Sequence, residues 1–291
     1  MNDKKLFSEG VKMAGNYNLA VCSIVRDCEK NLRKNIVVID KIRSYFKASV
    51  VIVFENDSID KTKEVLQQWS KRDKNVHVET QQNKGITIPH KDMEGVNKYF
   101  SWFRLSKLAG YRNNYLDKLE ALEFEPDFVI IVDLDVARIY FDGVIKSMAL
   151  ADEWDVVCSN SISLSPKLKR RYHDTYALVE LGKEKVPQTE ESIRENAKRW
   201  SFLREGQPLI PVYSAFGGLA IYRYEAIKSL RYWVALNHDK RVEARNEHFT
   251  FYQDIRAKGF NRIYINPAMR VKSQAVNIAL IRKFIKDKIY P

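Results

Sequence analysis

The sequence predicts an α/β protein in which a mostly parallel sheet is flanked by helices. Short apolar runs rich in β-branched residues, at 19–25, 50–54 and 128–132, are typical of strands buried on both faces of such a sheet. Segments 32–46 and 59–69 lie between these runs and place apolar residues three and four apart, which is the spacing of an amphipathic helix. Strands that alternate with helices of this length favour right-handed parallel crossovers.

The other elements expected in the N-terminal half follow in order. A short strand is expected at 76–79, and Asn83-Lys84-Gly85 reads as a turn. A helix is expected at 95–122, because its apolar residues recur with helical spacing. This helix leads the chain into the strand at 128–132.

The C-terminal half contains a long polar stretch, 165–207, with a basic run at 167–171. We interpret the stretch as a lid or binding segment, because long loops in compact domains are often functional; a solvated insertion without a role is the alternative. The other expected elements are a strand at 154–158, a helix at 190–200, a strand at 212–222 interrupted at Gly217-Gly218, a helix at 243–257, a strand at 262–265 and a basic amphipathic helix at 277–289. The last helix either packs on its own domain or lies on an anionic membrane surface.

Composition excludes several classes of protein. The 291 residues include 45% hydrophobic and 30% charged residues, which argues against a disordered or fibrous chain. No apolar run approaches the about 20 residues that span a bilayer, and the polar start lacks the apolar core of a secretory signal. Cys22, Cys28 and Cys158 have the spacing of neither a disulfide framework nor a zinc site, so we expect reduced thiols and a cytoplasmic protein.

Two carboxylates, Asp133 and Asp135, follow the strand at 128–132. Side chains two residues apart in an extended segment point the same way, and ligands of open α/β sheets collect at the carboxyl ends of strands. The pair can therefore present oxygens to one hard cation, which would neutralise a diphosphate leaving group. The alternative is a strand that ends in a polar turn, since an Asp-x-Asp arises by chance about once in a chain of this length.

Other polar residues are expected near the same edge of the sheet. Arg104 and Arg112, on the helix before this strand, could donate charge-assisted hydrogen bonds to phosphate oxygens, although each alone fits a solvent-facing helix position. The loop Glu55-Asn56-Asp57 follows an earlier strand and could accept hydrogen bonds from a base or ribose.

The order of these pieces resembles the nucleotide-sugar half of the GT-A glycosyltransferases. The motifs that carry the resemblance are Val25-Arg26-Asp27, the segment from Glu55 to Asp60, Arg112-Asn113 and Asp133-Leu134-Asp135. Segments 247–249, 259–260 and 265–267 are similar to the closing part of capsule and lipopolysaccharide transferases. The likeness covers residues 19–267, and it depends on order and spacing rather than on one motif.

The resemblance implies a GT-A, Rossmann-like fold and roles for particular residues. Asp133 and Asp135 would hold Mn²⁺ or Mg²⁺ against the diphosphate, Glu55 would take the place of the base-contacting aspartate, and the loop at 216–218 would lie beside the acceptor sugar. Asn56 and Asp57 replace the family's commoner second Asp and Gly, which leaves the base open. The residues expected to contact the nucleotide sugar are Arg26, Glu55, Asp57, Arg104, Arg112 and Asp133.

An inverting transfer also needs a carboxylate that deprotonates the acceptor hydroxyl. Glu247 is the first candidate for this base and Asp254 is the second; a surface acid on a helix is the alternative for either. His248 is a candidate for the metal shell, as a late histidine is in some of the family, and a packed structural histidine is the alternative.

We therefore expect a single domain over residues 1–291. It would comprise a nucleotide-sugar half at 19–135, an acceptor half at 136–267 that includes the insertion at 165–207, and a basic C-terminal helix at 268–291. The expected activity is metal-dependent transfer of a sugar from a nucleotide diphosphate donor to a glycan acceptor in polysaccharide or glycoconjugate synthesis.

Two other functions fit parts of the sequence. A nucleotidyltransferase also pairs aspartates around metal ions, but no GxxxxGK[ST] element is present. A nucleic-acid-binding protein would use the net charge of +12, but no RRM, helix-turn-helix or zinc spacing supports it, so no nucleic-acid partner is expected. A polyanionic glycan, or peripheral contact with an anionic membrane, accounts for the same charge.

Overall fold

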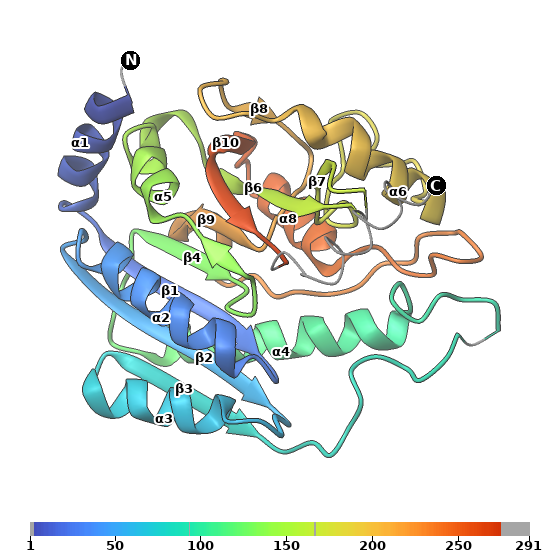
Figure 1. Cartoon of the computed structure of the whole chain (residues 1–291), viewed down its shortest axis with the longest axis horizontal. Helices are drawn as coiled ribbons and strands as arrows, with labels where there is room; N and C mark the ends of the chain where they lie inside the picture. Colours follow the sequence, from blue (N-terminus) through green and yellow to red (C-terminus); the bar gives the residue numbers. More distant parts are fainter. Residues whose placement is uncertain (1–2, 93, 166, 275–291) are drawn as a thin grey trace, which may run out of the picture.

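One continuous sheet organises the protein (Figure 1). The computed structural model describes residues 3–92, 94–165 and 167–274. Its strands pair in the order β3-β2-β1-β4-β9-β6-β10-β5, with β7 beside β6 and β8 beside β10. Their bounds are β1 Asn18–Val25, β2 Ala48–Asn56, β3 Val76–Gln81, β4 Phe128–Val132, β5 Arg138–Ile139, β6 Val156–Leu164, β7 Arg170–Tyr172, β8 Ile210–Pro211, β9 Leu219–Arg223 and β10 Ile263–Lys272.

The predicted mostly parallel sheet is confirmed. β1, β2, β3 and β4 are parallel neighbours, and β10 is parallel to β6. β9 runs antiparallel between β4 and β6, so it joins the two parallel groups without reversing their common direction. As a result β1, β2 and β4 all end at one edge of the sheet, where their following loops come together.

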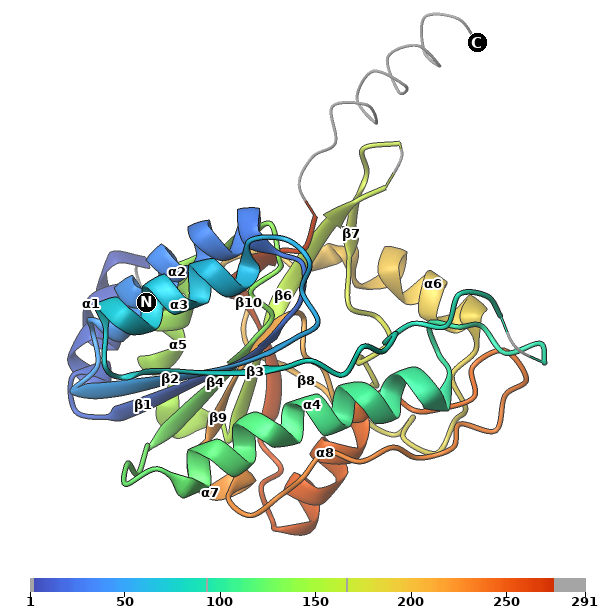
Figure 2. The same ribbon diagram turned by 90° about the horizontal axis from the view of Figure 1, so that it is seen from below.

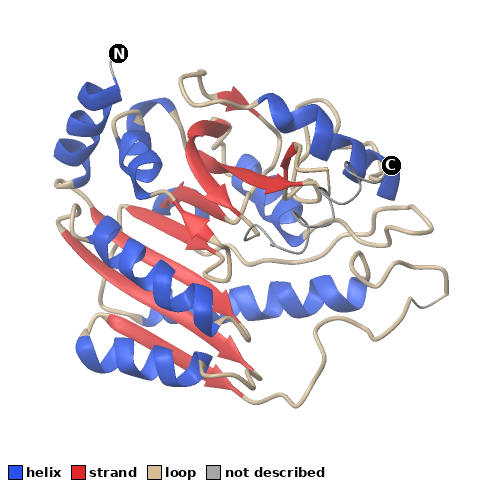
Figure 3. Cartoon of the chain, viewed as in Figure 1, coloured by secondary structure: helices blue, strands red, loops and turns tan. Residues whose placement is uncertain are grey.

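Helices cover both faces of the sheet, with α2, α3 and α5 on one side and α4 and α8 on the other (Figure 2). Strand residues alternate between these layers: Ala20 and Cys22 face the α4 side, whereas Leu19 and Val21 face the α2 side. The helices are α1 Asp3–Ala14, α2 Glu29–Arg43, α3 Thr62–Arg72, α4 Trp102–Ala121, α5 Phe141–Met148, α6 Glu190–Arg199, α7 Tyr224–Ile227 and α8 Glu247–Ala257, with 3-10 turns η1 Ala151–Glu153 and η2 Trp200–Phe202 (Figure 3). None of these described helices has the length and apolar character needed to cross a membrane.

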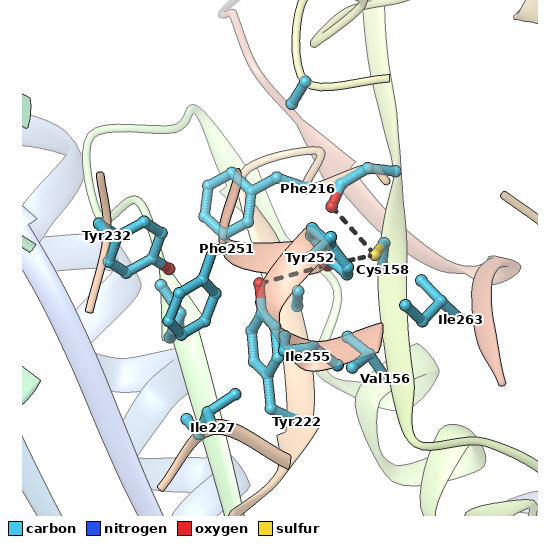
Figure 4. Close-up of a cluster of buried hydrophobic side chains, with 14 of the residues drawn as sticks. Val156, Cys158, Phe216, Tyr222, Ile227, Tyr232, Phe251, Tyr252, Ile255 and Ile263 are labelled. Atoms are coloured by element: carbon cyan, nitrogen blue, oxygen red, sulfur yellow. Dashed lines mark hydrogen bonds between the residues drawn. The ribbon is translucent and has the colours of Figure 1, made fainter. Parts of the chain in front are cut away.

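Aromatic side chains fill the core between α8 and the sheet (Figure 4). The Cys158 thiol lies 3.0 Å from the Tyr252 hydroxyl and 3.2 Å from the Ala215 carbonyl oxygen, and Tyr252 donates to the Tyr222 hydroxyl at 3.2 Å. All three cysteines are free and buried. These bonds satisfy the polar atoms of an otherwise apolar layer, and so hold α8 in place over the sheet.

The structure corrects several boundaries predicted from sequence. The helix expected at 95–122 begins only at Trp102, because the Ser101 hydroxyl caps it by accepting from the Arg104 amide at 3.3 Å. The strand expected at 212–222 is interrupted as predicted, but only Leu219–Arg223 forms β9. Gly217 and Gly218 have φ of +72° and +84°, so the chain turns sharply just before β9.

The C-terminal prediction is partly wrong. Residues 268–272, expected as the start of a basic C-terminal segment, extend β10 to Lys272 instead. A register shift between Asn266 and Arg270 accommodates Pro267, which cannot donate to the ladder. The helix predicted at 277–289 lies outside the described residues.

Three of the described helices were not predicted from sequence: α1, α5 and the four-residue α7. α1 lies in the polar start of the chain, and α5 follows β5; the two pack against each other. A Cβ at Gly10 would lie 2.0 Å from the Ile145 carbonyl oxygen, so the close approach of α1 and α5 depends on this glycine. Asp3 also accepts an ion pair from Lys146 at 2.6 Å.

Candidate active site

A cleft of about 570 Å³ opens at the carboxyl edge of the sheet. The ends of β1, β2 and β4 form its floor, α4 and the first turn of α8 form two walls, and the segment after β7 closes a third side. Its polar lining consists of Arg26, Asn56, Thr87, Arg104, Arg112, Asp133, Asp135, Ser161, His173, Asp174, Asn246, Glu247, His248, Ser273 and Gln274. The cleft therefore brings together most of the residues singled out from the sequence.

Arg112 joins the two helical walls. Its Nε donates to Glu247 Oε1 at 3.1 Å, and its Nη2 lies 3.4 Å from Asp133 Oδ1. The Arg112 and Glu247 side chains are 5% and 2% exposed, so this ion pair is removed from solvent. Arg112 Nη1 and Glu247 Oε2 are nevertheless buried without any hydrogen-bond partner among the described residues. Unpaired polar atoms beside a cleft are suited to bind a substrate.

Negative charge accumulates opposite Arg112. Burial, and then the charges of Asp135, Asp174 and Glu247, raise the pKa of Asp133 to about 7 although Arg112 opposes the shift. The Asp133 side chain stays 31% exposed, so it is both closely surrounded by protein and open to the cleft. Burial also raises the pKa values of Asp135 and Asp174. This surplus of carboxylates favours a bound cation.

The cleft residues fit a divalent cation with two protein ligands. Asp133 and Asp135 both line the cleft, and their oxygens are of the type that Mg²⁺ and Mn²⁺ prefer. Within the described ranges, no group of three or more His, Cys, Asp or Glu side chains is arranged to hold a metal ion. A cation here would therefore complete its shell with water and substrate phosphate, as Mg²⁺ commonly does.

His248 lies in the cleft wall. Its ring stacks on Phe216 with centroids 4.0 Å apart, and neither ring nitrogen has a hydrogen-bond partner among the described residues. Burial and the charge of Arg112 keep its pKa well below the usual value, so the ring is neutral. The structure thus shows His248 as a packed side chain at the cleft, and its role as a metal ligand stays a prediction.

The predicted nucleotide-binding residues separate into two groups. Arg26 and Arg104 line the cleft, and Arg26 Nη1 donates to the Gly85 carbonyl and the Thr87 hydroxyl at 3.3 Å each. Glu55 is fully buried and is not among the residues that line the cleft; its Oε1 accepts from the Ser58 amide at 2.8 Å, while Oε2 has no partner among the described residues. Asp57 does not line the cleft, because its Oδ1 accepts from the amides of Asn83 and Lys84 and braces that turn.

The two candidate bases lie in different places. Glu247 is at the first turn of α8 inside the cleft, whereas Asp254 lies two turns further along the helix and outside the cleft lining. The Asp254 carboxylate accepts from Trp233 Nε1 at 2.8 Å. Geometry therefore favours Glu247 over Asp254.

Sequence reasoning missed His173 and Asp174. Both lie in the long polar stretch directly after β7, and the Asp174 carboxylate accepts from the Gly217 amide at 2.8 Å. A Cβ at Gly217 would lie 2.4 Å from the Ser159 carbonyl oxygen, so this glycine permits the close approach that positions Asp174. The only available signal was the length of the stretch, which indicates function without identifying residues.

A family model described as Cryptococcal mannosyltransferase 1 matches residues 21–254. The chain belongs to this family. The match includes every cleft residue predicted from sequence, from Arg26 to His248, and it confirms that the chain belongs to a glycosyltransferase family. A search of curated proteins returned no match.

Solved structures resemble the chain in architecture more than in sequence. A structure titled "Crystal Structure of a Mycobacterial Protein" has a TM-score of 0.50 and 14% identity over 97% of this chain and 77% of its own. S. aureus TarS 1-349 has a TM-score of 0.46 and 13% identity over 94% of this chain and 66% of its own. The mannosyltransferase PcManGT from Pyrobaculum calidifontis, in complex with GDP-Man and Mn²⁺, has a TM-score of 0.47 and 13% identity. The match covers 94% of this chain and 65% of that one. The chain thus spans just under two thirds of the last two.

Proposed function

We propose that this protein is a metal-dependent glycosyltransferase that moves a sugar from a nucleotide diphosphate to a glycan acceptor. The observation that carries the proposal is the meeting of Asp133, Asp135 and Arg112 in one cleft, within a chain of the mannosyltransferase family. A diphosphate leaving group needs positive charge around it, and a sugar acceptor needs polar groups beside it. Because the family description names a mannosyltransferase, a nucleotide-activated mannose is the first donor to test.

On the donor side, Asp133 and Asp135 would hold Mn²⁺ or Mg²⁺. When bound, such a cation neutralises the charge that develops on the departing diphosphate. The unpaired Nη1 of Arg112 is available to donate to a phosphate oxygen, while its other nitrogens stay engaged with Glu247 and Asp133. Arg26, at the end of β1, adds a second positive charge to the cleft.

On the acceptor side, Glu247 is the group that would take the proton of the attacking hydroxyl. Its Oε1 is held by Arg112, and its Oε2 has no partner among the described residues. A carboxylate fixed by one oxygen and free at the other is oriented for proton transfer. We place the reaction in the cytoplasm, where cysteines such as these three stay reduced.

The test is a transfer assay with a panel of nucleotide sugars that includes GDP-mannose, with and without Mn²⁺. Asp133→Asn and Asp135→Asn should each lower kcat by about a hundredfold or more while the fold is retained, because each removes charge at the diphosphate. Asp254→Asn is the matched control, since its carboxylate lies outside the cleft lining and should leave kcat within about twofold of wild type.

Three outcomes would contradict the proposal. Full activity of both cleft variants would remove the metal site, and a large loss in Asp254→Asn would overturn the choice of Glu247 as the base. Release of pyrophosphate instead of a nucleoside diphosphate would identify a nucleotidyltransferase.

A further inference from the structure

Asp174 is a half-buried carboxylate of the cleft to which the proposed transfer assigns no role. Its Oδ2 accepts from the Gly217 amide at 2.8 Å, and its Oδ1 has no hydrogen-bond partner among the described residues. Oδ1 is not one of the buried polar atoms without a partner, so it retains surface that a ligand can reach. The carboxylate is therefore fixed by one oxygen and leaves the other free.

No cation pairs directly with Asp174 among the residues that the structure describes. Glu247, by contrast, accepts an ion pair from Arg112 at 3.1 Å, whereas Arg112 acts on Asp174 only at longer range. A half-buried anion without a cation is stabilised by hydrogen-bond donors, and the Gly217 amide supplies one. A ligand that carries neutral donors, such as the hydroxyl groups of a sugar, would supply the others.

Asp174 lies near the proposed cation site without belonging to it. Burial raises the pKa values of both Asp133 and Asp174; the charge of Asp174 adds to the shift at Asp133, and that of Glu247 adds to the shift at Asp174. Asp174 is therefore close to the proposed metal ligand and to the proposed base. Yet no three His, Cys, Asp or Glu side chains in the described part of the chain are arranged to hold a metal ion, which argues against a third ligand.

The order of the strands places Asp174 on one side of Asp133. Along the carboxyl edge of the sheet, the cleft residues succeed one another as Asn56 at the end of β2, Arg26 after β1, Asp133 after β4, Gly218 before β9 and Ser161 in β6. Asp174 is held at the last two of these strands, because Gly217 leads into β9 and the His173 amide donates to the Ser161 carbonyl at 3.1 Å. Asn56 and Arg26 lie on the opposite side of Asp133.

A nucleotide sugar would lie along this edge of the sheet. A cation at Asp133 and Asp135 sets the diphosphate at the end of β4, and the base and ribose are expected on the side of β1 and β2. The sugar is the next group beyond the diphosphate, so it would lie about 4.8 Å further, at the start of the neighbouring strand β9. Asp174 is anchored at that point by its bond to Gly217.

We propose that Asp174 is a specificity-determining residue for the transferred sugar, and that its Oδ1 accepts hydrogen bonds from hydroxyl groups of that sugar. This inference rests on the proposed glycosyl transfer and names the residue that selects the donor. The bond from Gly217 gives the free oxygen a defined position. A donor without a hydroxyl at this point would leave a half-buried carboxylate unpaired, which is the situation that discriminates most strongly between similar substrates.

The test measures kcat/KM for GDP-mannose and for analogues that each lack one hydroxyl of the mannose, with Mn²⁺ present. If the transfer assay identifies another nucleotide sugar, the analogues of that sugar are used. Wild type should lose about ten- to a hundredfold in kcat/KM with the analogue whose missing hydroxyl pairs with Asp174. Asp174→Ala should lose a similar factor with the complete donor, and should treat the two donors alike within about twofold.

Ser159→Ala is the matched control for the turn that Asp174 holds. The Ser159 hydroxyl donates to the Gly217 carbonyl at 2.7 Å, and Ser159 is fully buried outside the cleft lining. This variant should lower kcat/KM for GDP-mannose and all its analogues by one common factor. Binding of GDP with Mn²⁺, measured by isothermal titration calorimetry, should change by no more than about twofold in Asp174→Ala, because GDP lacks the sugar.

Three results would overturn the inference. Undiminished discrimination by Asp174→Ala would show that Asp174 does not contact the sugar, and an equal loss with every analogue, as in Ser159→Ala, would show that it only holds the turn. A loss of about tenfold or more in the binding of GDP with Mn²⁺ would identify a metal ligand. These results leave the proposed transfer intact, whereas failure of wild type to transfer from any nucleotide sugar would reject both.

Discussion

Arg112 is the residue on which the geometry of the cleft most depends. It is buried between α4 and α8, and it is the cation that contacts both Glu247 and Asp133 among the described residues. Arg112→Ala would leave Glu247 buried without a positive partner, so we expect the free energy of unfolding to fall by about 3–5 kcal/mol in urea titrations. Arg112→Met combined with Glu247→Gln should recover part of this loss, since no unpaired charge remains. A change below about 1 kcal/mol in the single variant would contradict this account.

At the residue scale, the sequence predicted which side chains could take part in the site, but it did not predict which of them are in contact. Asp133 and Asp135 could be found because they end an apolar strand, and strand ends of a parallel sheet meet at one edge. The ion pair between Arg112 and Glu247 could not be predicted, because the two residues are 135 positions apart in the chain. Asp174 had no local pattern at all, since its position depends on the backbone turn at Gly217.

At the scale of secondary-structure elements, Glu180 fixes the position of α6 within the insertion. Its carboxylate contacts Arg199 and Trp200 at the end of α6, and it accepts from Lys183 at 2.8 Å. Burial would raise the pKa of Glu180, but hydrogen bonds from Arg199, Lys183 and Trp200 lower it from an ordinary 4.5 to about 2. Because the folded-state pKa lies below that of the unfolded chain, ionised Glu180 stabilises the fold at neutral pH.

We expect Glu180→Gln to lower the free energy of unfolding by about 1–2 kcal/mol at neutral pH, a value reduced for partial exposure of the group. The deficit should shrink as the pH falls from 4.5 towards 2, where wild type also loses the charge. Urea midpoints measured across this range provide the test. Glu191→Gln, an exposed acid in the first turn of α6, is the control and should show no such pH dependence. A deficit independent of pH would indicate lost packing rather than lost charge.

Elements with strong periodicity were predictable, and those defined by tertiary contact were not. The strands at 19–25, 50–54 and 128–132 fall within β1, β2 and β4, because continuous apolar runs require burial on both faces. α1 was missed because its sequence is polar overall, and it is stabilised by packing on α5. The direction of β9 could not be read either, since strand composition does not distinguish parallel from antiparallel pairing in a buried position.

At the scale of the whole molecule, the sheet passes through both predicted halves without a break. β4, from the donor half, is bonded along its length to β9, and β9 to β6. We therefore expect a single cooperative unfolding transition, with tryptophan fluorescence and far-UV circular dichroism giving coincident curves. Two separate transitions would show that the halves are independent domains.

A nucleotide sugar with Mn²⁺ at about 100 times its dissociation constant should raise the free energy of unfolding of the whole chain by about 2.7 kcal/mol.

The stretch from 165 to 207 departs from β6 and returns to β8 at the rim of this rigid sheet. It contributes His173 and Asp174 to the cleft, yet none of it belongs to β4, the strand that Asp133 and Asp135 follow. Substitutions or insertions in this stretch can therefore reshape one side of the cleft, while β1, β2 and β4 and the loops that follow them keep their positions.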